Sequence, residues 1–197
     1  MSSGTIVYPK IEDYKNLNRY SDEELQSTSD TEVRIRTNRF VELRALAFAT
    51  PHKLFGEKAY DKIRDLVDSY FNEFVESYKL WFDIGIILEL RSQLKGYKNP
   101  YIYLKHIGYR NIWEVKEELK SNKQYLIKLK SKIYGLCLAT PIDITPRDQE
   151  QYVDGHEEPI YYLERELDDL EDSLEECLTT INTLELLIKY WDGHEQD

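Results

Sequence analysis

Two short segments of the chain repeat a set of residues that could bind a metal. Residues 152–157 read YVDGHE and residues 190–195 read YWDGHE, so each supplies Asp, His and Glu within four residues. Carboxylate and imidazole groups are common metal ligands, but neither segment belongs to an HExxH motif or faces an ExxH pair. Glycine favours the end of a helix, where a histidine is stabilised by the helix dipole. We therefore interpret both segments as helix boundaries, and we predict no metal site and no cofactor.

Covalent and phosphate chemistry receive no support from the other motifs. Cys137 and Cys177 lie in helical patterns without a CxxC pair, which is typical of small packed residues. The chain has no GxSxG, GxxxxGK[ST] or GxGxxG motif, and its eight glycines are dispersed. We predict that the protein is not an enzyme and has no catalytic residues.

Sixteen tyrosines are a high number for a chain of 197 residues. Tyrosine joins a large apolar ring to a hydrogen-bonding tip and is enriched in protein interfaces. We expect about half of these tyrosines to cover the core. The candidates for contact with a partner protein lie in the N-terminal segment and near helix ends: Tyr8, Tyr14, Tyr101, Tyr103 and Tyr109.

The elements that would position these residues begin with two helix-start signals. Ser21 with Glu24 forms a capping box, which predicts a short helix. Ser29 with Glu32 forms a second box, which predicts the start of a longer helix that ends before Pro51. Residues 1–20 have no sustained apolar period, so we expect an extended arm there.

A longer helix is predicted over residues 57–95. Its apolar and aromatic stripe is broad enough for burial on more than one side, so we expect it at the centre of the fold. Gly85 interrupts the stripe and predicts a kink or a close helix crossing. A short helix is predicted from Pro100 to about Gly108.

Two segments in the second half of the chain share a heptad pattern. In residues 112–140, and again in residues 160–191, apolar residues recur at alternating steps of three and four. The two helices would span roughly 43 and 50 Å, so they can lie side by side after a loop over residues 141–158. Asn122 occupies a d position, where a polar residue costs stability and can fix register.

The charges beside the two seams predict the direction of pairing. An antiparallel pair brings e positions opposite e positions, and the signs at these positions are complementary. The e positions are Lys116, Lys123 and Lys130 in the first helix and Glu164, Glu171 and Glu185 in the second. We therefore predict an antiparallel hairpin, and we include these six residues among the candidate partner-binding residues.

The charge of the whole chain is negative, with 37 acids against 26 bases and a formal charge of -11, so we do not expect direct nucleic-acid binding. Residues 91–133 nevertheless hold 11 Lys and Arg against 3 Glu, a net of +8, while residues 148–176 hold 13 acids against one Arg, a net of -12. These segments could neutralise each other within one subunit or could join subunits head to tail into a ring. Both alternatives remain open from the sequence.

Targeting signals are not evident. The first twenty residues lack a basic stretch followed by an apolar core, and no uncharged apolar run reaches 18 residues. We expect a soluble intracellular protein, in the cytoplasm or in a virion, without membrane contact.

The sequence predicts an all-α fold of one structural domain, because 8 Gly and 6 Pro are too few for an all-β fold. It would contain an arm over residues 1–20, a helical core over 21–110 and an antiparallel helical hairpin over 111–197. The predicted function is a non-catalytic structural subunit of a larger, homo-oligomeric or multi-protein complex, such as a ring or connector of a virus particle. The alternative is an acidic helical inhibitor that binds a host nucleic-acid enzyme as a DNA mimic.

Overall fold

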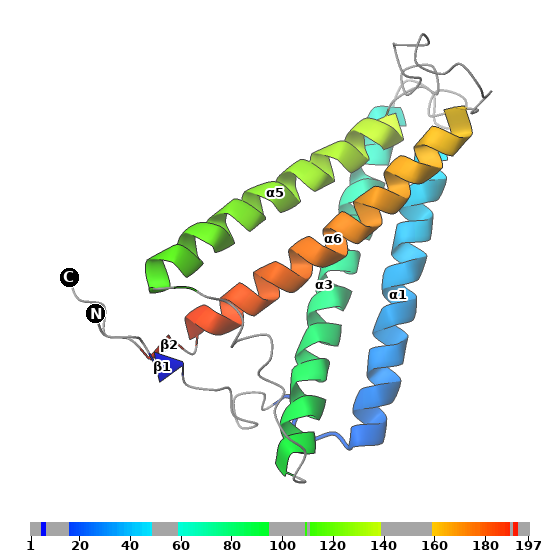
Figure 1. Cartoon of the computed structure of the whole chain (residues 1–197). Helices are drawn as coiled ribbons and strands as arrows, with labels where there is room; N and C mark the ends of the chain where they lie inside the picture. The colour runs from blue at the N-terminus through cyan, green and yellow to red at the C-terminus, as the bar shows by residue number, and fades with distance from the viewer. Residues whose placement is uncertain are drawn as a thin grey trace.

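The protein is built from four long helices arranged as two antiparallel pairs (Figure 1). The computed structural model describes residues 5–6, 16–48, 59–94, 109, 111–138, 159–189 and 191–192. The helices are α1 (Asp22–Phe48), α3 (Ala59–Leu94), α5 (Ile112–Leu138) and α6 (Pro159–Lys189). Helix α1 pairs with α3, and α5 pairs with α6. The two pairs pack together at one end and diverge toward the other. Because the four long helices make up nearly all of the described residues, the all-α prediction is confirmed.

Helix α1 is one continuous helix, and the predicted break before Ser29 is wrong. Its start is as predicted, since Ser21 Oγ accepts a hydrogen bond from the Glu24 amide at 3.2 Å and the Glu24 carboxylate accepts one from the Ser21 amide at 2.8 Å. The hydroxyl groups of the next turns do not act as caps. Those of Thr28 and Thr31 donate to backbone carbonyls one turn earlier, which keeps them compatible with the helix.

Helix α3 contacts α1, α5 and α6, as its broad apolar stripe predicts. The close helix crossing predicted at Gly85 is wrong. An added Cβ at this position would meet no atom within 4 Å, and α3 continues through it on an exposed face. The helix tolerates a glycine at this position because it is long and the packing of its other turns stabilises it.

The α5–α6 hairpin has the predicted antiparallel direction. The Asn111 side chain caps α5 by accepting a hydrogen bond from the Glu114 amide at 3.0 Å. Val115 packs with Leu184, and the Cys177 thiol donates to the Asn122 carbonyl at 3.4 Å. These two contacts fix the register. Helix α6 ends at Lys189, so the predicted extension of its seam to residue 191 is wrong.

Asn122 does not lock the register through its side chain. Its amide group donates to the Glu118 carbonyl of the preceding turn at 3.0 Å. The polar group is therefore satisfied within its own helix. Apolar packing along the seam sets the register instead.

The main core lies where the two helix pairs converge. Phe40, Phe74, Ile133 and Leu167 are fully buried there, one from each helix. Two smaller clusters occupy the diverging ends. Val115, Leu184 and Leu187 hold the open end of the α5–α6 pair, and Leu25, Ile84 and Ile87 hold that of the α1–α3 pair. Each pair therefore carries its own small core beyond the shared one.

Only parts of the predicted arm lie within the described residues. Thr5–Ile6 forms strand β1, which pairs antiparallel with β2 (Trp191–Asp192), and Asn16–Arg19 forms a turn. The predicted short helix after Pro100, the loop over residues 141–158 and the YVDGHE segment lie outside the described residues. No helix among those described has a stretch apolar enough to cross a membrane.

Candidate functional site

The acidic helix α6 is held against α1 by arginines. Arg44 donates to Asp168 and, at 3.1 Å, to Glu171, while Arg36 pairs with Glu175 at 3.1 Å. The predicted pairing of Glu171 with a lysine of the hairpin is therefore wrong. A planar guanidinium can bind two carboxylates at once, so arginine suits this position better than lysine does.

Arg36 is the most enclosed charge of this contact. Its side chain is 12% exposed, and its guanidinium lies over the rings of Tyr78 at 4.8 Å and Trp81 at 5.0 Å. Tyr78 in turn shares a 2.6 Å hydrogen bond with Thr179 of α6. The Arg36 side chain therefore joins α1, α3 and α6 at one point.

Helix α5 is joined to α3 by a smaller polar cluster around Asp68. Lys130 pairs with this carboxylate at 2.5 Å, and the Tyr134 hydroxyl donates to it. The hydrogen bond from Lys130 and then that from Tyr134 lower the pKa of Asp68. Lys130 also lies 5.1 Å from the ring centre of Phe71. The prediction that Lys130 pairs with α6 is wrong, because the side of α5 that carries it faces α3.

One predicted pair does form across the hairpin. Lys123 contacts Glu185 at 2.7 Å, and Lys79 of α3 approaches the same carboxylate at 3.9 Å. Burial raises the pKa of the nearby Asp83, although Lys79 and Lys189 oppose this effect. Glu164, by contrast, lies on an exposed turn of α6 far from this cluster.

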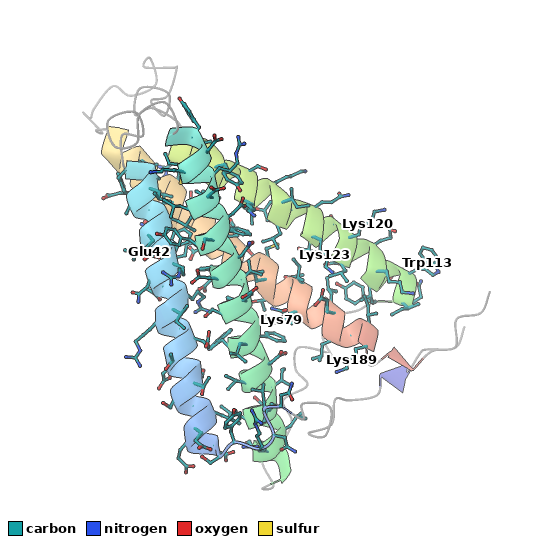
Figure 2. The ribbon with its side chains drawn as sticks, turned by 180° about the vertical axis from the view of Figure 1, so that it is seen from behind. Glu42, Lys79, Trp113, Lys120, Lys123 and Lys189 are labelled. Atoms are coloured by element: carbon teal, nitrogen blue, oxygen red, sulfur yellow. The ribbon has the colours of Figure 1, made fainter. Side chains whose placement is uncertain are left out.

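An exposed face of α5 carries both apolar and basic side chains. Trp113 is 69% exposed and Ile127 is 66% exposed. Between them lies the lysine row, which we define as Lys116, Lys120 and Lys123. A shallow groove runs along this face, and its surface is made mostly of apolar atoms. It is lined by the lysine row, Leu119, Gln124 and Ile127. Figure 2 shows Trp113, Lys120 and Lys123 along the ribbon of α5.

The outer face of α6 carries a matching set of acids. Asp169, Asp172 and Glu176, which we define as the acid row, are all exposed and lie opposite the buried Leu167 and Leu174. This row is distinct from the carboxylates that pair with α1. The acidic helix therefore uses one side to hold the fold and presents another to solvent.

One of the predicted tyrosines lies within the described residues. Tyr109 packs against the cluster of Val115 and Leu187, and burial together with Glu118 raises its pKa. It helps to close the end of the hairpin, and its contact with a partner stays a prediction. Tyr8, Tyr14, Tyr101 and Tyr103 lie outside the described residues.

Trp113 and Ile127 are not among the residues predicted to bind a partner protein. A signal was available, because both are large apolar residues that lie off the heptad seam. Such residues have no core to enter when the seam is already filled. They are therefore left on the surface.

The two cysteines are unpaired and buried. Burial raises the pKa of the Cys137 thiol to about 12 and also raises that of Cys177, so both thiols are protonated near neutral pH. Within the described ranges, no group of three His, Cys, Asp or Glu side chains is arranged to hold a metal ion. Of the two DGHE segments, only Asp192 falls in these ranges.

No protein-family model, no curated protein and no solved structure matches this chain.

Proposed function

We propose that the protein is a non-catalytic assembly protein that forms a homo-oligomer through the exposed face of α5. The observation that carries this proposal is the exposure of Trp113 and Ile127 on one helix face, two turns on either side of Lys120. Tryptophan is among the residues that contribute most to protein interfaces. The lysine row between the two apolar residues would form the polar part of the same contact.

The physical reason for self-association is the cost of leaving this face in water. Burial of apolar surface contributes about 25 cal/mol per Å2, and a tryptophan offers one of the largest apolar areas of any side chain. The groove beside Ile127 gives an entering side chain additional apolar contact. A protein partner provides such a side chain, whereas a small charged ligand does not.

The DNA-mimic alternative receives less support from the contacts of α6. A mimic needs its carboxylates to be free to replace phosphates. Asp168, Glu171 and Glu175 instead pair with Arg44 and Arg36 of the same chain, so only the exposed acids of α6, such as the acid row, could act in this way. Membership of a virus particle stays a prediction.

The mass of the protein in solution tests the proposal. We expect light scattering after size exclusion to give a mass above the chain mass of 23.5 kDa, and to return that mass for the Trp113→Ser, Ile127→Ser double variant. A matched control removes two exposed apolar residues of α1, Val41→Ser and Phe48→Ser, and should keep the oligomer. A wild-type protein that stays monomeric at every concentration would show the proposal to be wrong.

A further inference from the structure

We propose that the face of α5 binds the outer face of α6 in a second copy of the chain, with the lysine row antiparallel to the acid row. This inference rests on the proposed function and names the partner surface. In this contact Lys116 lies opposite Glu176, Lys120 opposite Asp172, and Lys123 opposite Asp169. The rows belong to different faces of one molecule, so each copy offers both halves of the contact.

The spacing of the two rows supports an antiparallel match. Along α5 the lysines are separated by four and then three residues. Read in the opposite direction along α6, from Glu176 to Asp169, the acids are also separated by four and then three. Both rows cover seven residues, about 10 Å of helix, and all six residues are exposed. Lys123 also pairs with Glu185 of its own chain at 2.7 Å, and its side chain remains 52% exposed to a second carboxylate. In a parallel arrangement, Lys120 and Asp172 would not lie at the same level when the outer charges of the two rows are aligned.

The rows cannot meet in this way within one chain. Val115 packs with Leu184, and Cys177 contacts Asn122, so the register of the hairpin brings Lys116 level with Thr183. The proposed pairing requires Glu176 at that level, a shift of seven residues or about 10 Å along the helix. In addition, α6 faces α5 with its buried side, whereas the acid row lies on its solvent side. The complementary charges therefore point to a second copy.

The same alignment gives the apolar residues of α5 a place to pack. Continued by one turn, it brings Trp113 level with Thr179 and Thr180 of the second copy. At the other end Ile127 comes level with Arg165, whose aliphatic stem can cover an apolar neighbour. A contact between two different faces is heterologous, so it produces a closed ring or an open filament.

Charge reversal at the central pair tests the inference. We expect Lys120→Glu and Asp172→Lys, each alone, to weaken self-association roughly tenfold or more, because like charges then face each other. The double variant Lys120→Glu, Asp172→Lys should associate like the wild type. In an equimolar mixture of the two single variants, contacts between unlike copies join opposite charges, so a filament or an even-numbered ring in which the two variants alternate should form. Sedimentation velocity at several concentrations measures these effects.

Matched controls use residues of the same charge on other faces of the same helices. Lys128→Glu on α5 and Glu166→Lys on α6 are exposed, and they should leave the association constant within a factor of about two. Circular dichroism should show the same helix content in all variants. Raising the salt concentration should weaken the wild-type oligomer, because screening reduces the attraction between exposed rows.

The outcomes separate the two proposals. A monomeric wild type overturns the proposed function and this inference with it. An oligomer that is lost in the Trp113→Ser, Ile127→Ser variant but kept in both single charge reversals overturns the inference alone. The inference is also overturned if the single variants are folded and monomeric and the double variant stays monomeric.

Discussion

At the scale of single residues, Arg36 shows how a largely enclosed charged side chain is stabilised in a helical protein. Its guanidinium lies against two aromatic rings and pairs with Glu175, while its Nη1 atom is buried without a hydrogen-bond partner. Stacking on aromatic rings partly replaces the water that the guanidinium has lost. The carboxylate of Glu175 is thus the main countercharge for this site.

Replacing Glu175 by Gln should destabilise the protein by about 1–2 kcal/mol, because it leaves the enclosed guanidinium without a countercharge. The value is below that of a fully buried pair, since the Glu175 side chain is 39% exposed. Urea unfolding followed by circular dichroism gives the change. Glu166→Gln is the matched control, because Glu166 is exposed and lies outside the acid row, and it should change the free energy of unfolding by less than about 0.5 kcal/mol. Equal effects of the two changes would contradict this account of Arg36.

At the scale of elements, the helices and the seam were predictable, but several charge partners were not. Capping signals at Ser21 and Asn111 and the heptad pattern mark helix starts and buried faces through local rules. The partner helices predicted for Lys130 and Glu171 were wrong, because a heptad pattern describes the contact between only two helices. When a second pair packs against the hairpin, the positions beside the seam face that pair instead. The exposed apolar face of α5 could have been recognised from residues off the seam.

The Asp68 cluster should make the contact between α3 and α5 depend on pH. Because the pKa of Asp68 is lowered below its ordinary value of 3.8, its ionised form stabilises the fold above that pH, and the contribution is lost as the pH falls through the lowered pKa. Asp68→Asn should therefore cost about 0.5 kcal/mol at pH 7, an amount limited by the exposure of the pair. The difference from the wild type should disappear in strong acid. Urea unfolding at a series of pH values measures it.

Asp65→Asn provides the control for this prediction. Asp65 is an exposed carboxylate one turn before Asp68 on the same helix. Its replacement should leave the pH profile of stability close to that of the wild type. A profile for Asp68→Asn that runs parallel to the wild-type profile at all pH values would show that the cluster does not contribute through its charge.

At the scale of the whole molecule, stability should be concentrated where the helix pairs converge. The large core cluster joins all four helices there, whereas the start of α5 is held mainly by Val115 and its neighbours on α6. The relative placement of the two pairs could not be predicted from sequence, because periodicity identifies a buried face but not the helix that covers it.

Hydrogen exchange should reveal this gradient along α5. We expect the slowest amide exchange around Leu129 and Ile133, and exchange at least roughly tenfold faster near Val115, because fewer buried contacts must break to open that end. Mass spectrometry on the monomeric Trp113→Ser, Ile127→Ser variant measures the rates, because in the proposed oligomer a second copy covers this part of α5. Uniform protection along the helix in that monomer would indicate that the diverging end is as stable as the shared core.

The arrangement as two helix pairs also implies an order of folding. Hydrogen bonds and ion pairs within the pairs join residues 34 to 69 positions apart, such as Arg39 with Glu73 and Arg91 with Asp22, whereas Arg44 and Asp168 are 124 positions apart. Closing a loop costs more entropy as it lengthens, so the pairs should form before they dock. The arginine contacts between α1 and α6 would then be largely absent from the transition state. Removing them should speed unfolding while leaving the folding rate nearly unchanged, and would thereby shorten the lifetime of the native state.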